Sequence, residues 1–230
     1  MRPPRKPHGG PPGGDARRGR GPRRHGQQRQ GQQSQVRQGP MVSGRQATPP
    51  HQAAPQQGTR LFFAAWPSPE IQQQLGGVAQ RAQRECGGQM TPDHNIHLTL
   101  LFLGGIAHER LTELERLAGT VQAPRFTLAV DRLDYWKHNR ILWAGVRECP
   151  QALPALVAQL EKTLGAVGFR FDSRPYVPHI TLARDAHRAP AQAAIPPVEW
   201  AVEEFVLVES VQLDESRVYE VLHRWPLAGS

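Results

Sequence analysis

The chain has 230 residues and a formal net charge of +8, and it is long enough to bury a sizeable core. The charge is uneven, because residues 1–59 hold eleven Lys and Arg and one acid, which leaves 17 basic and 19 acidic residues for 60–230. No apolar run approaches the roughly 18 to 20 residues that cross a bilayer, and the N-terminus lacks the apolar segment of a signal peptide. We therefore expect no membrane association and a cytoplasmic location.

Residues 1–59 are rich in Arg, Gly, Pro and Gln and almost free of large apolar side chains. Such a composition cannot offset the entropy of ordering by burial, so we predict a disordered tail. The tail could contact RNA phosphates without sequence preference. It could equally be a solvated tail, or upstream sequence that precedes a true start at Met41.

Residues 60–230 alternate strand and helix patterns and are predicted to form one folded domain. Aromatic and β-branched runs indicate strands, whereas a Ser-Pro start and leucines at positions 153, 156, 160 and 164 indicate helices. In chain order the patterns predict a strand at 60–66, a helix at 68–86, a strand at 95–103, a helix at 108–121, a strand hairpin at 125–136 and 140–149, a helix at 151–169, and strands at 178–184, 198–210 and 219–227.

One short motif occurs twice, in NIHLTLLFLG at 95–104 and in PHITLAR at 178–184. Residues two apart on a strand share a face, so His97 points with Thr99 and His179 points with Thr181. Leucine or isoleucine occupies the opposite face of both strands. A single such strand is ordinarily a half-exposed strand whose polar side has no function, but the repetition suggests two similar lobes that face one another.

Two imidazoles that flank one point can act as acid and base, because imidazole titrates near neutral pH. Such a pair suits a reaction in which a nucleophile enters and a leaving group departs on opposite sides of one centre, and in-line displacement at phosphorus is the obvious candidate. Hydroxyls and a cation would then bind the non-bridging oxygens. Neither motif has a carboxylate or Cys partner at metal-ligand spacing. We therefore expect chemistry without a metal or another cofactor.

Arg184 ends the second motif, and a guanidinium is a side chain that suits a phosphate. On a straight strand it would lie on the face opposite His179, so it reaches the site only if the strand ends or bulges after Thr181. Phe62 is interpreted as a core aromatic, whereas Phe63 could be either a core side chain or a platform for a nucleobase.

The quoted motifs, together with RLFFAAW and YEVLHRWPL, resemble the 2H phosphoesterase superfamily, and within it the bacterial RNA 2′,3′-cyclic phosphodiesterase (2′-5′ RNA ligase) family. The resemblance implies a bilobal α+β fold, with two pseudo-symmetric antiparallel-rich sheets, helices outside and a central cleft. It also implies hydrolysis of RNA 2′,3′-cyclic phosphate ends to 2′-phosphates, with reversible 2′-5′ joining of tRNA-like ends.

By the same resemblance, His97 is the proton donor and His179 the proton acceptor, while Thr99, Thr181 and Arg184 bind the substrate. We expect a monomer. Two alternatives stay open: another phosphodiesterase of the superfamily, acting on 2′-5′ oligoadenylates or a small cyclic nucleotide, and a protein that binds RNA ends without catalysis.

Overall fold

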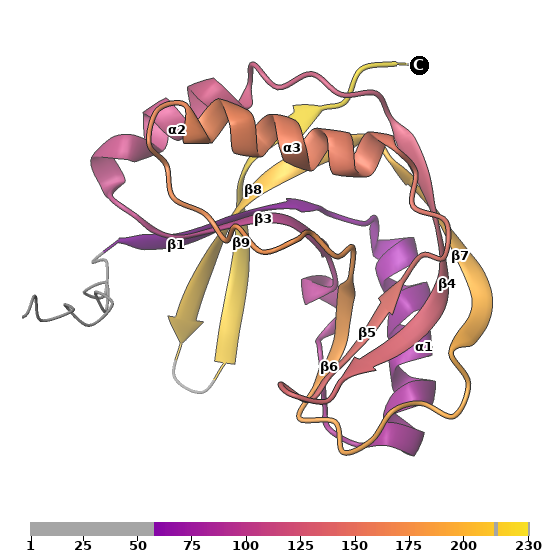
Figure 1. Ribbon diagram of the computed structural model, residues 1–230. Helices are drawn as coiled ribbons and strands as arrows, with labels where there is room; N and C mark the ends of the chain where they lie inside the picture. Colours follow the sequence, from indigo (N-terminus) through magenta and orange to yellow (C-terminus); the bar gives the residue numbers. More distant parts are fainter. Residues whose placement is uncertain (1–57, 214–215, 230) are drawn as a thin grey trace, which may run out of the picture. The chain divides into compact units, whose positions relative to one another are not determined.

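The computed structural model describes residues 58–213 and 216–229 (Figure 1), so the tail predicted for residues 1–59 lies almost wholly outside the described residues. The described part is a mixed α/β fold with one large antiparallel sheet and few helices. Its elements are β1 (Thr59–Ala65), α1 (Pro69–Cys86), β2 (Gln89–Met90), a 3-10 turn (Asp93–Asn95), β3 (Leu98–Ile106), a 3-10 turn (His108–Arg110), α2 (Leu111–Ala118), β4 (Phe126–Trp136), β5 (Ile141–Gly145), α3 (Ala152–Gly165), β6 (Ile180–Arg184), β7 (Ala194–Val202), β8 (Glu204–Leu213) and β9 (Ser216–Pro226).

The nine-stranded sheet has the order β7-β4-β5-β6-β3-β1-β8-β9, with the short β2 paired to β6. The two strands that carry the repeated motif, β3 and β6, are neighbours at its centre. They are joined by a single antiparallel pair, Leu98 with Ile180, whereas the strands on either side have longer ladders. The sheet therefore consists of two halves that meet where the motifs meet.

This arrangement differs from the two sheets that the family resemblance implies, because hydrogen bonds connect both halves into one sheet. Sequence alternation identifies strands but not their partners, and one shared pair is enough to make the sheet continuous.

Helices α1 and α3 each pack on the half of the sheet that does not contain the strand preceding them. Helix α1 follows β1 but packs on β6 and β7, and α3 follows β5 but packs on β3 and against α2 (Figure 1). The leucines predicted to line α3, at positions 153, 156, 160 and 164, are all fully buried. Each half is therefore covered by a helix whose connecting chain comes from the other half.

The predicted strand at 198–210 is wrong in one respect, since the chain leaves strand geometry at Glu203 and forms two strands. Strand β7 pairs with β4 at one edge of the sheet, whereas β8 pairs with β1 and β9 in the other half. Two consecutive polar residues, Glu203 and Glu204, interrupt the alternation at the break, and buried apolar residues follow from Phe205. The sequence pattern therefore contains a signal that the prediction of one strand did not use.

Gly88 fixes the place where β2 meets β6. Its φ angle is +92°, and a Cβ atom there would lie 2.4 Å from the carbonyl oxygen of Arg184. Gly168 has a similar φ of +82°, but nothing lies within 4 Å of its Cβ position. A side chain at either position would therefore suffer backbone strain, but only at Gly88 would it also clash with a neighbouring strand.

We predict that Gly88→Ala lowers the free energy of unfolding by about 2 kcal/mol or more, because backbone strain and overpacking add. Gly168→Ala, the matched control, should cost about 1 kcal/mol from backbone strain alone. Urea unfolding at constant m-value measures both. Equal losses in the two variants would show that the contact between Gly88 and β6 carries no energy.

Candidate active site

A central pocket of about 580 Å³ opens at the junction of the two halves of the sheet. All five sequence-predicted site residues line it: His97, Thr99, His179, Thr181 and Arg184. Thr99 lies on β3, and Thr181 and Arg184 lie on β6, while each histidine directly precedes one of these strands. The two histidines lie 82 positions apart in the chain. The fold thus gathers in one place the residues that the sequence pattern singled out.

The pairing of Leu98 with Ile180 explains this gathering. If the antiparallel register continues by one residue on each side, His97 falls opposite position 181, and Thr99 falls opposite His179. Directly opposed residues have Cβ atoms about 4.5 to 5.5 Å apart and share a face. Leu98 and Ile180 themselves are buried on the opposite face.

His97 is held through both of its ring nitrogens. Its Nδ1 lies 2.7 Å from the carbonyl oxygen of Asn95, and its Nε2 lies 3.1 Å from Oγ1 of Thr99. Gln72, on α1, donates to the two carbonyls that flank Asn95, and the Asn95 side chain donates to the carbonyl of Arg217 on β9. The carbonyl acceptor requires a proton on Nδ1, so neutral His97 presents its Nε2 lone pair to the pocket.

Aromatic rings surround His97. Trp66 stacks on it with ring centroids 5.3 Å apart and planes 6° apart, while Phe62 and Tyr219 lie 5.0 and 5.2 Å away. Phe62 lines the pocket, whereas Phe63 is fully buried in the main core. Our interpretation of Phe62 as an ordinary core residue was therefore incomplete, and Phe63 is the core aromatic of the pair.

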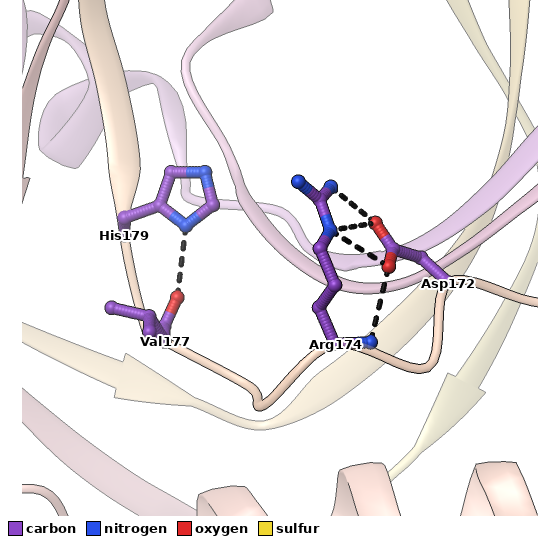
Figure 2. A network of polar contacts seen from close by, with 4 residues as sticks. All are labelled: Asp172, Arg174, Val177 and His179. Atoms are coloured by element: carbon purple, nitrogen blue, oxygen red, sulfur yellow. Dashed lines mark hydrogen bonds and ion pairs between the residues drawn. The ribbon is translucent and has the colours of Figure 1, made fainter. Parts of the chain in front are cut away.

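His179 is held in a corresponding way. Its Nδ1 lies 2.8 Å from the carbonyl oxygen of Val177, as Figure 2 shows, and the edge of the Trp136 ring packs on it at 4.5 Å. In the loop before it, the Arg174 guanidinium is paired with Asp172. Both histidines are thus tied through Nδ1 to the carbonyl two residues earlier.

Arg184 reaches the pocket because β6 contains the bulge that its position requires. Trp143 and Leu142 are consecutive on the neighbouring strand β5, but they pair with Thr181 and Ala183 of β6. Leu182, which lies between these two partners, is therefore the extra residue of a bulge. Leu182 and Ala183 are both fully buried. The extra residue reverses the side-chain alternation, so Arg184 lies on the same side as Thr181.

Burial dominates the titration of both histidines. It lowers the pKa of His97 to about 4, with smaller contributions from the positive charges of His179 and Arg184. Burial also lowers the pKa of His179, and Arg184 acts in the same direction. Both imidazoles are therefore neutral at pH 7 in the protein without substrate.

Sequence reasoning missed the residues that hold the histidines in place. Trp66, Trp136 and Tyr219 are aromatic, but nothing in their spacing connects them with the motifs. Asn95 acts through its backbone carbonyl, for which no side-chain signal exists. Knowledge of strand pairing would have been needed to find any of them.

Two further observations concern the described residues. In residues 58–213 and 216–229, no group of three or more His, Cys, Asp or Glu side chains is placed to hold a metal ion. In the same part of the chain, every helix is too short or too polar to cross a membrane.

Comparison with known proteins agrees with this geometry. A model of the 2′-5′ RNA ligase superfamily matches residues 67–213. An RNA 2′,3′-cyclic phosphodiesterase of Escherichia coli K12 is 38% identical over 175 residues, which cover 73% of this chain and 96% of the relative. A protein of the same name from Thermus thermophilus is 34% identical over 185 residues, covering 74% of this chain and 91% of the relative.

Solved structures are similar as well. Escherichia coli LigT complexed with 3′-AMP aligns with a TM-score of 0.66 and 36% identity, over 74% of this chain and 98% of LigT. TT0787 of Thermus thermophilus aligns with a TM-score of 0.60 and 31% identity, over 74% of this chain and 98% of that protein. Fold and site together define a protein in which two antiparallel strands each present a histidine and a threonine to one pocket. The chain belongs to the 2′-5′ RNA ligase superfamily.

We predict that His97 in the protein without substrate stays neutral, with the proton on Nδ1, until the pH falls to about 4. The unfolded chain takes up this proton near pH 6.5. The free energy of unfolding should therefore fall as the pH drops from 6.5 towards 4, because the unfolded state binds more protons in that range.

Imidazole ¹⁵N shifts measured against pH test this directly, with the urea-unfolded protein as the control. A His97 that titrates at the same pH in the folded and unfolded protein would contradict the assigned environment.

Proposed function

We propose that this chain is an RNA 2′,3′-cyclic phosphodiesterase, which hydrolyses the terminal cyclic phosphate of RNA to a 2′-phosphate. The names of its relatives support this assignment. The observation that carries it is the pair of histidines on one pocket, each tied at Nδ1 to a backbone carbonyl. The two Nε2 atoms are thereby left to exchange protons with a substrate.

The reaction needs one proton acceptor and one proton donor. His179 Nε2 accepts a proton from water as the water oxygen bonds to phosphorus. The bond from phosphorus to the 3′ oxygen breaks, and His97 Nε2 donates a proton to that oxygen. Because the chemistry is an in-line displacement, the two groups act on opposite sides of phosphorus.

His97 must carry a proton at Nε2 before it can act as the donor. Burial disfavours the charged form, as its low pKa indicates. A bound cyclic phosphate places a negative charge beside the ring, and a nearby opposite charge favours the protonated form. The substrate therefore helps to charge its own acid catalyst.

Thr99, Thr181 and Arg184 bind the non-bridging oxygens. The hydroxyl of Thr99 is 3.1 Å from His97 Nε2. A phosphate group that approaches this nitrogen therefore also comes within reach of the hydroxyl. The Arg184 guanidinium supplies positive charge, which stabilises the additional negative charge on these oxygens in the transition state.

The two halves of the sheet serve in this proposal as two lobes, each supplying one histidine from a similar strand. Run with a ribose hydroxyl in place of water, the same site would join RNA ends by a 2′-5′ bond. A monomer acting on RNA ends in the cytoplasm, with RNA contact by residues 1–59, stays a prediction.

We predict that His97→Ala and His179→Ala each reduce kcat for a dinucleotide 2′,3′-cyclic phosphate by about 10²- to 10⁴-fold, as loss of a general acid or base does. The double variant should lose much less than the product of the two effects, because the residues act as a unit. Thr99→Ala and Thr181→Ala should cost less, since the phosphate keeps other partners.

The control is His108→Ala, which changes an exposed histidine in the 3-10 turn before α2 and should retain full activity. The pH profile should be bell-shaped, and a chelator should leave the rate unchanged. Full activity of either single variant, or inactivation by chelator that a divalent ion reverses, would refute the two-histidine mechanism.

A further inference from the structure

Gln72, near the start of α1, is buried although its side chain is polar. Its Nε2 donates two hydrogen bonds, each 3.2 Å long, to the carbonyl oxygens of His94 and Ile96. These two residues stand on either side of Asn95, whose own carbonyl holds His97 Nδ1. A buried amide needs such partners, and here both acceptors are backbone groups next to the one that holds the ring.

Three consecutive peptide units before His97 are held in place. The N–H of Ile96 donates to the carbonyl of Asp93, 3.0 Å away, and this N–H belongs to the same planar unit as the Asn95 carbonyl. Gln72 binds the carbonyls of the units before and after it. The Asn95 carbonyl therefore cannot turn away from His97 without loss of a backbone hydrogen bond, and its neighbours cannot shift without loss of a bond to Gln72.

Helix α1 contacts this 3-10 turn closely. Gly76 lies four residues after Gln72, on the same face of the helix. A Cβ atom at Gly76 would lie 2.2 Å from Oδ1 of Asp93, so the helix and the turn touch there. Trp66, which stacks on His97, belongs to the short connection that leads into the same helix. The start of α1 is thus packed against the surroundings of one histidine.

We propose that Gln72 is a positioning residue for the proton donor, since it holds the backbone around Asn95 so that the Asn95 carbonyl binds His97 Nδ1. This inference rests on the proposed function. A carbonyl oxygen accepts only from a protonated nitrogen, so the bond fixes the proton of the neutral ring on Nδ1 and leaves Nε2 facing the substrate. The same bond favours the charged ring, because it is made to the protonated form.

The bond to the Asn95 carbonyl matters because His97 is buried. Burial lowers the pKa of His97 most strongly, and the bond to this carbonyl acts in the opposite direction. Without Gln72 the carbonyl would be held less firmly, so less of His97 would carry the proton that it donates to the 3′ oxygen. We expect the loss in kcat rather than in KM, because the proton is transferred in the transition state.

The test compares Gln72→Met with Gln83→Met in the full chain. Methionine is nearly as long as glutamine and is a good helix former, but it donates no hydrogen bond. Gln83 is the matched control, because it lies on the same helix and its Nε2 also donates to a backbone carbonyl, that of Gly88, at 3.3 Å. Gln72→Glu repeats the test with an oxygen in place of the donor, and it replaces Gln72→Met if that variant does not fold.

Gln72→Met should lower kcat for adenosine 2′,3′-cyclic phosphate by about 10- to 100-fold, as a small misplacement of a reacting group does. Its KM should change by about twofold or less. Gln83→Met should keep kcat and KM within about twofold of the wild-type values. All rates are measured well below the unfolding temperature of each variant, so that only folded protein is compared.

Long-range ¹H–¹⁵N spectra of the protein without substrate give a second readout, which does not depend on activity. In Gln72→Met a share of His97 should carry its proton on Nε2 instead of Nδ1. His179, whose Nδ1 is held by the carbonyl of Val177, should keep its wild-type spectrum. The second histidine therefore reports any general loosening of the fold.

A wild-type kcat or a wild-type His97 tautomer in Gln72→Met would overturn the positioning role. Equal losses of kcat in Gln72→Met and Gln83→Met, or the same tautomer change at both histidines, would also overturn it, because they would indicate a general effect on the fold. In these cases the wild-type protein would still hydrolyse the cyclic phosphate, and the proposed function would stand. Absence of hydrolysis in the wild-type protein would instead refute the proposed function, and the tautomer of His97 would still decide whether Gln72 positions the ring.

Discussion

The site depends on one antiparallel contact, between Leu98 and Ile180, at the centre of the sheet. Each of these residues follows a histidine directly in the sequence, and each is buried. Because side chains alternate along a strand, burying this pair turns both histidines and both threonines to the other face. The apolar contact that connects the two halves of the sheet therefore also sets the relative position of the catalytic groups. A shift of one residue in either strand would expose an apolar side chain and bury an imidazole in its place.

Backbone groups do most of the remaining positioning. The carbonyls of Asn95 and Val177 bind Nδ1 of the two histidines, so both rings offer the same nitrogen to the pocket. The surroundings then distinguish the two rings. Trp66 covers a face of His97, whereas the ring that packs closely on His179 does so edge-on. Two similar strands thus place two similar rings in environments that differ in burial.

A structural feature could be predicted from the sequence where it depends on residues close together in the chain. The motif residues and the leucine spacing of α3 were predictable, because strand and helix periods relate neighbours in the chain directly. Arg184 could be placed only conditionally, since a bulge is a property of two paired strands and not of one. The role of Trp66 depends on partners far away in the sequence, which alternation does not encode, whereas the break at Glu203 is marked by two consecutive polar residues. The two sheets came instead from the family resemblance, and the pairing of Leu98 with Ile180 joins them into one.

Burial of the site also bears on its choice of substrate. Burial of the ring, and to a smaller extent the nearby positive charges, disfavour a proton on His97 before substrate binds. An uncharged RNA end would leave His97 without the added proton, and the imidazole could not serve as an acid. A cyclic phosphate brings a negative charge into a region of weak screening, where a charge acts strongly on a neighbouring ring. In the proposed active site, His97 therefore carries its catalytic proton only when a phosphate is bound. Selectivity for phosphorylated RNA ends follows from the same burial that lowers the pKa of His97.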